Sequence, residues 1–504
     1  MRGLQERLKA LSSARLQGIG RGVEKESLRV TQQGTLATTP HPRALGAALT
    51  HPHITTDFSE AQLELITGVH RSAEAAESEL TQVHQAVYRA LGDEMMWVGS
   101  MPCTLPPDDQ IPLGQYGTSN VGQSKTVYRM GLGHRYGRRM QTISGIHHNW
   151  SLPEVTTAEY FGLIRNFRRH SFLLLYLFGA SPAVARGFAD GAKDLVPLGP
   201  DTMHMPHATS LRMGNLGYQS DAQTSLSVSY NSLDSYAASL SDALVRPYPA
   251  YEKLGIRSAD GGYNQLNDSL LQIENEFYGT IRPKRVIFPG ERPLHALRER
   301  GVEYVEVRLM DLNPFVPIGI GADTMRFLDV FLLHCLLSES PPDTPDEIAA
   351  LGRNQHRTAA RGREPGLRLE RGGREVTLVE WGAQLVEECA PIAAALDAVN
   401  GNTLYSAAVA AASATLSDAR LAPSARVLAA MAKDYGNSFQ HFTQAQSKQT
   451  QSELLARPFP ADAEARFREM ARESIDAQKS IEAADTMPFE IYRQQYLSPQ
   501  RLGL

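Results

Sequence analysis

The sequence has few cysteines and little net charge. Its three cysteines, Cys103, Cys335 and Cys389, are far apart, odd in number and form no C-x-x-C pair, which argues against a disulfide framework and against a zinc knuckle. The 50 basic and 55 acidic side chains leave a formal net charge of −5, so no general positive field attracts nucleic acid or an anionic membrane surface. We therefore expect a cytoplasmic protein whose partners are small molecules, with neither nucleic acid nor a membrane among them.

Long apolar runs are missing too. The most apolar stretch, SFLLLYLFGASPAVA from Ser171, is interrupted by Gly179 and Pro182, well short of a membrane span, and predicts a buried helix and its end. The first residues carry charges where a signal peptide has its apolar core, and they predict a short amphipathic helix that ends near Gly18. Nothing here predicts export.

Several common catalytic motifs are absent as well. GTSNVGQSKT from Gly117 resembles a phosphate-binding loop, but Gln123 and Ser124 separate its second glycine from Lys125, and a P-loop has its lysine directly after that glycine. GIGRG and GLGHRYG do not fit the dinucleotide-binding fingerprint, and neither G-x-S-x-G nor H-E-x-x-H occurs. Any phosphate chemistry must therefore use another arrangement.

What the chain does contain is a mixed first half and a helical second half. Up to about Ile320, strand-like alternation is mixed with helical periodicity, and beyond it nearly every segment repeats apolar residues at helical spacing. No repeat or clear linker separates the halves, so we treat 1–504 as a single catalytic unit with an α+β part over 1–320 and a mainly helical part over 321–504. The basic segment RTAARGREPGLRLERGG predicts a solvated loop.

Four strand-like segments of the first half carry polar side chains on one face. In RGVEKESLRV, Glu24 and Glu26 share a face because strand side chains alternate. For each face alone, the simpler interpretation is a solvent-exposed strand face. Together, the four faces favour one sheet surface that binds cations and phosphate, because carboxylates with one imidazole suit Mg²⁺ or Mn²⁺. Periodicity does not show that the strands are neighbours. The other groups are Glu60, Gln62 and Glu64 just after Asp57; His147 with Asn149; and Tyr304, Glu306 and Arg308.

Nine ordered segments, among them GIGRGVEKESLRV, QYGTSNVGQSKTVYRMGL, RYGRRMQTISGIHHNWSLP, GVEYVEVRLMDLNPFVPIGI and the C-terminal EAADTMPF, strongly resemble bacterial glutamate–cysteine ligases of the proteobacterial type. The resemblance is dense to Ile320 and thinner beyond. It implies an α+β, glutamine-synthetase-like fold, in which helices surround a curved antiparallel sheet that forms a funnel. It also implies ATP-dependent ligation of glutamate to cysteine through a γ-glutamyl phosphate, giving γ-glutamylcysteine, the first step of glutathione synthesis, with Mg²⁺ or Mn²⁺ as cofactor. The oligomeric state stays open, with a monomer as one option.

The resemblance also assigns roles to residues. Arg308 falls where the family contacts nucleotide phosphate, and with Glu24 and Glu306 it forms the expected catalytic set; Arg212 falls at a position that binds substrate carboxylate. The implied metal ligands are Glu24, Glu26, Asp57, Glu64, His147 and Glu306, which reverses the preference for a solvated face. The implied cysteine pocket consists of Phe58, Tyr128, Leu132, Gln141, Tyr218 and Tyr278.

Two features depart from the enterobacterial members of that family: the segment after SLPE is short, and His148 and Trp150 flank Asn149, which bears on the rim near His147. The closest alternative is a related ligase that joins glutamate to a different amine, against which the aromatic pocket argues. An alternative from another class is a non-catalytic metal- or nucleotide-binding protein, which would have lost ligands. No cysteine is required as a nucleophile, because the implied reaction forms no covalent enzyme intermediate.

Overall fold

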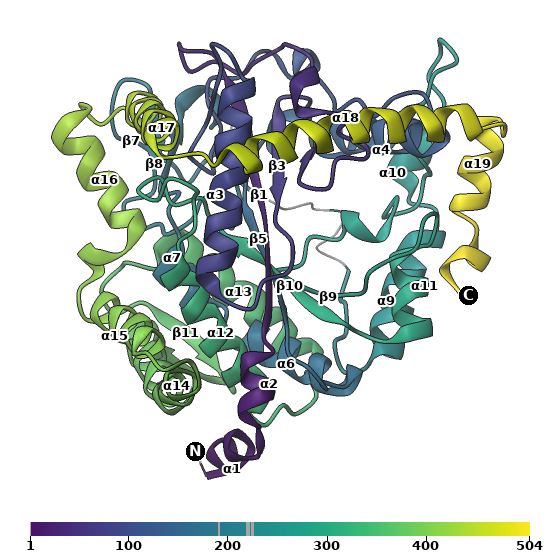
Figure 1. Ribbon diagram of the computed structural model, residues 1–504. Coiled ribbons are helices and arrows are strands. Elements are labelled where there is room, and N and C mark those ends of the chain that lie inside the picture. The colour runs from purple at the N-terminus through teal and green to yellow at the C-terminus, as the bar shows by residue number, and fades with distance from the viewer. Residues whose placement is uncertain (1, 190–191, 218–221, 223–225, 504) are drawn as a thin grey trace.

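The central element of the protein, seen in a computed structural model that describes all residues except 1, 190–191, 218–221, 223–225 and 504, is an antiparallel sheet (Figure 1). It has seven strands in the order β2-β3-β1-β5-β10-β9, with β4 paired to β1. The predicted α+β class with an antiparallel sheet is confirmed. The strands are β1 (Gly20–Val30), β2 (Ile54–Thr56), β3 (Gln62–Ile66), β4 (Met95–Met96), β5 (Ile146–Ser151), β9 (Ile281–Lys284) and β10 (Tyr304–Met310).

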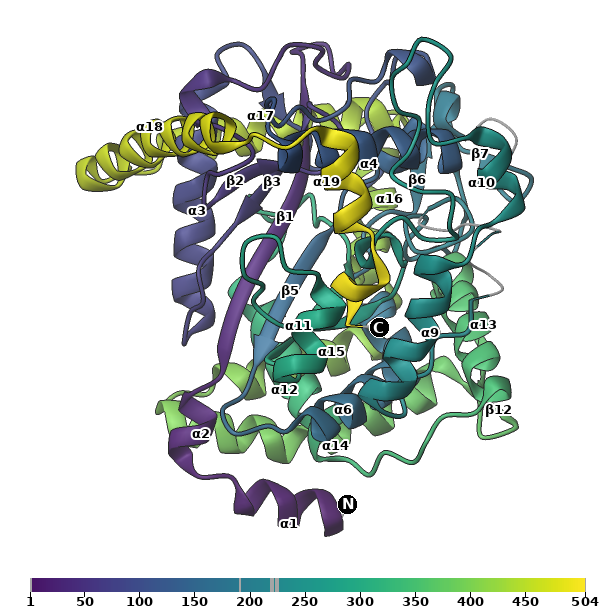
Figure 2. The same cartoon turned by 90° about the vertical axis from the view of Figure 1, so that its right-hand side faces the viewer.

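The long strand β1 has two different faces. Val23 and Lys25 lie on the face that α3 (Ala73–Ala90) covers, where Lys25 Nζ is 3.0 Å from His84 Nε2 of that helix. Figure 2 shows α3 on one side of the sheet, and β1 is paired with β3 along one edge and with β5 along the other. The other face carries Glu24 and Glu26, so α3 leaves this face of the sheet to the site described below.

Helices surround the sheet, and two small sheets lie outside it. The described helices of the first half are α1 (Arg2–Ala10), α2 (Ser13–Gln17), α3, α4 (Asn120–Tyr136), α5 (Arg138–Gln141), α6 (Thr157–His170), α7 (Phe172–Phe178), α9 (Leu233–Val245), α10 (Pro249–Leu254) and α11 (Pro293–Arg300). Those of the second half are α12 (Ala322–Leu337), α13 (Pro345–Arg361), α14 (Leu378–Asn400), α15 (Leu404–Ser417), α16 (Pro423–Asp434), α17 (Phe439–Ala456), α18 (Ala461–Ala484) and α19 (Phe489–Tyr496). The small sheets are β6 (Ala183–Ala185), β8 (Thr202–His204) and β7 (Val196–Pro197), and the hairpin of β11 (Arg368–Arg371) and β12 (Arg374–Thr377).

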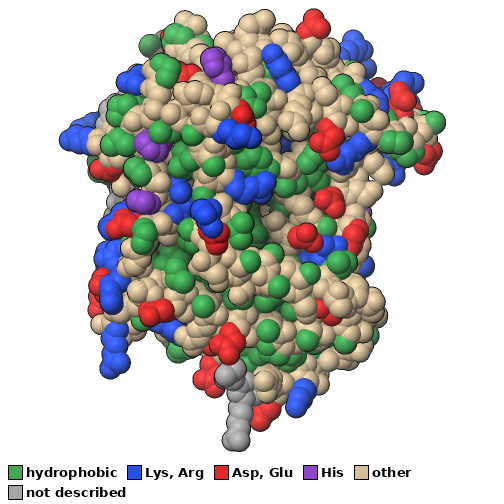
Figure 3. Space-filling view, turned by 90° about the vertical axis from the view of Figure 1, so that its left-hand side faces the viewer, with side chains coloured by type: hydrophobic (Ala, Val, Ile, Leu, Met, Phe, Trp, Pro, Cys, Tyr) green, Lys and Arg blue, Asp and Glu red, His purple; other side chains and the backbone are tan. Residues whose placement is uncertain are grey.

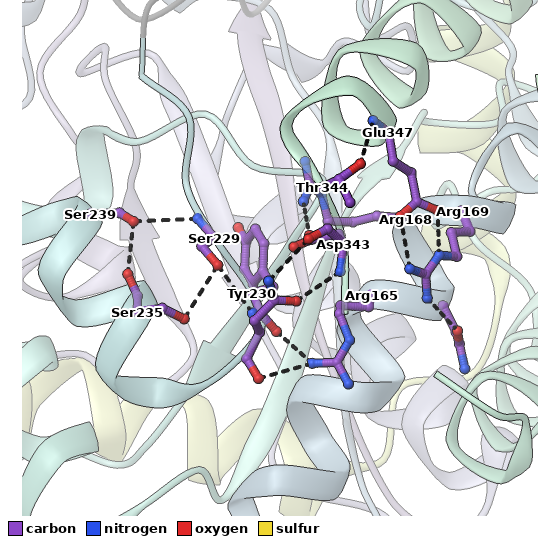
Figure 4. Close-up of polar contacts among 12 residues, drawn as sticks. Arg165, Arg168, Arg169, Ser229, Tyr230, Ser235, Ser239, Asp343, Thr344 and Glu347 are labelled. Carbon is purple, nitrogen blue, oxygen red and sulfur yellow. Dashed lines mark hydrogen bonds and ion pairs between the residues drawn. The ribbon is translucent and has the colours of Figure 1, made fainter. Parts of the chain in front are cut away.

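Charged side chains at the end of α6 join the first half of the chain to the second. Arg168 Nη1 lies 3.3 Å from Asp343 Oδ2, and Arg169 forms a two-point ion pair with Glu347 at 2.7 and 2.9 Å (Figure 4). Two oriented hydrogen bonds to a carboxylate hold a guanidinium more firmly than a single contact does. The end of α6 is therefore fixed against the start of α13. That the whole of 1–504 forms one unit stays a prediction.

Two sequence-based predictions of local structure need correction. The N-terminal helix is two helices, because Ser12 caps α2 by accepting the Arg15 backbone N–H; its predicted end at Gly18 is correct. The basic segment is not only a loop: it begins in the last turn of α13 and contains β11. Its last two residues, Gly372 and Gly373, form the turn to β12 and both have positive φ, the backbone conformation that tight hairpin turns need.

The predicted buried apolar helix is α7, which ends at Gly179. Throughout the described part of the chain, no helix has both the length and the apolar character needed to span a membrane. On the face shown in Figure 3, acidic and basic side chains are interspersed and form no continuous basic stripe.

Candidate active site

The polar faces of four strands form one surface, because β3, β1, β5 and β10 are consecutive neighbours in the sheet. The register pairs Glu24 with His147 and Glu26 with Glu64. Directly opposed residues on antiparallel strands have Cβ atoms roughly 4.5–5.5 Å apart and point to the same side. The shared surface predicted from alternation therefore exists, and the strand order supplies the adjacency that alternation could not.

This surface is one wall of a cavity of about 450 Å³. The opposite lining comes from α4, α5, the segment around Glu274 and the C-terminal helix α19. Twelve of the fourteen residues predicted from the sequence line it: Glu24, Glu26, Asp57, Phe58, Glu64, Tyr128, Leu132, Gln141, His147, Tyr278, Glu306 and Arg308.

His147 stands at the centre of the carboxylates. Its Nδ1 is 3.1 Å from Glu24 Oε2 and 3.6 Å from Glu306 Oε1, and its Nε2 is 3.6 Å from Glu26 Oε1. Glu24, His147 and Glu306 each offer one ligand atom within 4.8 Å of the other two, a spacing that one metal ion can bridge. Arg308 Nη1 lies 2.9 Å from Glu306 Oε1, so a fixed cation adjoins the cluster.

Two of the clustered carboxyls resist ionisation. Burial, and then the nearby charge of Asp57, raise the pKa of Glu26 to about 8. Burial, and then Glu24, raise the pKa of Glu64 well above its usual value. Desolvation and like charge both disfavour the ionised form of a carboxyl group. The basic groups of the protein are therefore not enough to keep all the carboxyls of this wall ionised.

The neighbouring groups shift in the opposite direction. Burial opposes ionisation of Glu306, but the charges of Lys284 and Arg308 outweigh it and lower the pKa of this carboxyl well below its usual value. Burial, and then Arg308, lower the pKa of His147. A neutral imidazole is the form that binds a metal, so His147 is suited to be a ligand.

Aromatic and apolar residues gather beside the carboxylates. Phe58 lies between β2 and β3, Tyr128 and Leu132 are on α4, and Gln141 ends α5. Gln141 Nε2 donates to the Tyr278 hydroxyl at 2.9 Å, which fixes the phenol in the cavity wall. Five of the six residues of the predicted cysteine pocket therefore lie together, and Tyr218 falls outside the described residues.

Arg212 does not line the cavity. Its side chain is 2% exposed, donates to the Arg308 carbonyl at 2.9 Å and lies 3.8 Å from Asp311. Its charge is close enough to oppose the rise in the pKa of Glu26. Arg212 therefore lies behind the cavity wall, where it holds the backbone of Arg308. Its contact with a substrate carboxylate stays a prediction.

Glu60, which alternation grouped with Glu64, does not belong to the site. It precedes β3 in a turn, and its carboxylate accepts the backbone N–H groups of His41 and Gln115 at 2.9 and 2.7 Å. Alternation fails there because it holds only inside a strand. His148 and Trp150 are both fully buried on the core side of β5, so this departure from the family pattern does not line the cavity.

Sequence reasoning missed several lining residues. Arg282 and Lys284 project from β9, and Lys284 Nζ lies 3.6 Å from Glu306 Oε2. Tyr492 and Tyr496 line the cavity from α19. The β9 strand has only four residues and gives no clear alternation signal for its pair, and the tyrosines show only the four-residue spacing of one helix face.

The C-terminal motif EAADTMPF holds α19 near the site. Asp485 accepts from Asn120 Nδ2 at 2.6 Å, and the Met487 carbonyl accepts from the same amide at 2.8 Å. Because Asn120 begins α4, the segment before α19 is tied to a helix that lines the cavity.

Comparison with known proteins agrees with this geometry. The glutamate-cysteine ligase family model matches residues 5–358. The chain is 47% identical to a glutamate–cysteine ligase of Pseudomonas fluorescens, covering 94% of this chain and 92% of that protein, and 45% identical to one of Alcanivorax borkumensis, covering 98% and 99%.

Solved structures give the same result. A crystal structure of glutamate–cysteine ligase from Francisella tularensis in complex with AMP superposes with a TM-score of 0.91 at 36% identity, covering 95% of this chain and 97% of that one. A bifunctional glutathione synthetase from Pasteurella multocida gives 0.71 at 26% identity, covering 93% of this chain and 57% of that one. By sequence and by structure, this chain belongs to the glutamate–cysteine ligase family.

Proposed function

We propose that this chain joins the γ-carboxylate of glutamate to the amine of cysteine at the expense of ATP, giving γ-glutamylcysteine, ADP and phosphate, the first step of glutathione synthesis. Its family membership and the names of its relatives support the reaction. The AMP in the complex of the Francisella relative supports ATP as the nucleotide. The observation that carries the proposal is one cavity in which a carboxylate–imidazole wall faces an aromatic pocket.

The carboxylate–imidazole wall fits Mg²⁺ or Mn²⁺. Its donors are carboxylate oxygens and one imidazole, which these ions accept. The raised pKa values of Glu26 and Glu64 are those of groups that bind a proton in the absence of a cation. The proposed ligands are Glu24, Glu26, Asp57, Glu64, His147 and Glu306; when bound, the ions would neutralise and orient the phosphates of ATP.

The remaining chemistry is positioning and electrostatics. The γ-phosphoryl group passes from ATP to a γ-carboxylate oxygen of glutamate, and ADP leaves; the amine of cysteine then attacks the acyl carbon, phosphate leaves and the nitrogen loses its proton. Arg308, held 2.9 Å from Glu306, and Lys284, 3.6 Å from it, supply fixed positive charge for the transferred group. No covalent bond to the protein is needed, and the three cysteines are buried thiols without disulfides.

The aromatic pocket selects the amine. Phe58, Tyr128 and Leu132 enclose a small side chain such as that of cysteine, and the hydroxyl of Tyr278 provides a polar group for its carboxylate. A polyamine would require carboxylates among these pocket residues, and the described ones offer none. We place the enzyme in the cytoplasm, because reduced cysteine and ATP are supplied there.

Amine competition tests the proposal. Purified protein with ATP, Mg²⁺ and glutamate should release ADP and form γ-glutamylcysteine when cysteine is added. 2-Aminobutyrate should also react, because an apolar pocket separates a thiol from a methyl group by only roughly 1–3 kcal/mol. If cysteine gives no product while another amine couples readily, the cysteine assignment is wrong and the related ligase is correct.

A further inference from the structure

A second group of metal-ligating side chains lies outside the cavity, at the junction of α6 and α12. His170 is the last residue of α6, and His334 and Cys335 are consecutive residues of α12. One ligand atom from each lies within 4.8 Å of the other two, and none of the three lines the active-site cavity. We propose that His170, His334 and Cys335 bind a Zn²⁺ ion.

The two helices that carry these side chains are held in place independently of any metal. Asn166 Nδ2, one turn before His170 on α6, donates to the Cys335 carbonyl at 2.9 Å. The ion pairs of Arg168 and Arg169 anchor the same turn of α6 to the segment that begins α13 (Figure 4). The ligand atoms therefore converge because the helix junction is rigid, which lowers the entropic cost of closing a site.

A carboxylate orients the central histidine. Glu388 Oε2 on α14 lies 2.8 Å from His334 Nε2, and a carboxylate next to that nitrogen favours the tautomer with its proton there. The other ring nitrogen, Nδ1, then has its lone pair available. Histidine ligands of metals almost always show such a carboxylate or carbonyl partner on the second nitrogen.

Both histidines carry a buried nitrogen that the protein leaves unused. His334 Nδ1 and His170 Nδ1 are shielded from solvent and have no hydrogen-bond partner among the described residues, and the His334 side chain is only 1% exposed. A buried polar atom without a partner costs free energy, and native structures usually satisfy it. A metal ion between the two rings would satisfy these nitrogens.

The donor set selects the ion. Two imidazoles and one thiolate suit Zn²⁺, whereas Mg²⁺ prefers oxygen ligands. A three-residue set leaves the fourth tetrahedral position to a water molecule. His170 is half-buried, so an ion can reach the cluster from the surface.

Binding should release a proton. Burial, and then the adjacent Cys389, raise the pKa of the Cys335 thiol well above its usual value, so without metal the thiol is protonated. Zn²⁺ binds the thiolate, so a Zn–S bond forms as the S–H proton passes to solvent.

Cobalt is the probe that separates this site from the active site. Full-length protein stripped with a chelator should develop a near-ultraviolet thiolate-to-Co²⁺ charge-transfer band that saturates at one equivalent and disappears when one equivalent of Zn²⁺ is added. The active-site group of Glu24, His147 and Glu306 contains no sulfur, so Co²⁺ bound there cannot give this band.

Four variants test the assignment. Cys335→Ser should abolish the band, while Cys103→Ser, an equally buried cysteine outside the cluster, should keep it. Glu388→Gln should keep the band but weaken Zn²⁺ binding on the order of 10- to 100-fold. If Cys335→Ser does not fold, His170→Gln at the helix end should still weaken Co²⁺ binding. A wild-type protein without the band, or a band that persists in folded Cys335→Ser, would overturn the site.

Discussion

Replacing Glu26 with glutamine should stabilise the metal-free protein in a pH-dependent way. Burial and Asp57 raise the pKa of Glu26 from 4.5 to about 8. Between these values the folded state binds more protons than the unfolded state, so stability falls as pH rises, by about 1.4 kcal/mol per pH unit. Below pH 4.5 Glu26 is protonated in both the folded and the unfolded state, so it does not change the pH dependence of stability. Above about pH 8 it is ionised in both states, and the loss of stability has reached its full size.

The expected size follows from this window. Near pH 7.5 the ionisation of Glu26 has lowered the free energy of unfolding of the wild-type protein by up to about 4 kcal/mol. Glutamine cannot ionise, so the variant avoids this loss. Its side-chain oxygen can still accept the Gly145 N–H, which Glu26 accepts at 2.6 Å. For 504 residues unfolding as one unit, this raises Tm by up to about 4 °C, whereas near pH 5 the gain falls below about 1 °C.

Differential scanning calorimetry in chelator at both pH values measures the effect. Glu60→Gln is the matched control, because that buried carboxylate accepts two backbone N–H groups and its loss should not stabilise at either pH. A gain for Glu26→Gln that is equal at both pH values, or absent near pH 7.5, would refute the reasoning. The same variant should lose ligase activity, because the carboxylate that destabilises the fold is a proposed metal ligand.

Three further outcomes are expected. Glu24→Gln and Glu306→Gln should each abolish turnover at saturating Mg²⁺ while circular dichroism stays native, because both side chains are on the cavity face of their strands; wild-type-like turnover would contradict the ligand assignment. Mg²⁺ with ATP should raise Tm more than ATP with chelator, and equal shifts would mean that the carboxylate wall binds no metal. Tyr278→Phe should raise the KM for cysteine more than the KM for glutamate or ATP, because its hydroxyl faces the aromatic pocket; equal changes in all three would place the phenol elsewhere.

The carboxylate wall was predictable to the extent that it is local. Alternation places Glu24 and Glu26 on one face of a strand whatever lies beside it. That β5 and β3 flank this strand is a property of the whole sheet and is not contained in any single segment. The resemblance to a known family, which compares the whole chain in order, supplied that long-range information.

The residues that were missed show where local patterns end. β9 has only four residues and includes Pro283, too short a run for alternation to identify Arg282 and Lys284, and proline is unusual inside a strand. Tyr492 and Tyr496 have ordinary helical spacing, and only tertiary contacts bring α19 to the cavity. The hairpin β11–β12 was mistaken for a loop because its strands are rich in charge and half-exposed.

The two-faced strand β1 restricts how this family can evolve. Loss of a single residue between Gly20 and Glu24 would shift the rest of the strand by one position, so that Lys25 faced the cavity and both glutamates faced α3. Such a deletion would remove the proposed metal ligands and bury their charges in one step, whereas a substitution changes one side chain at a time. We therefore expect insertions and deletions among relatives to occur in the loops that flank β1, and β1 itself to change only by substitution.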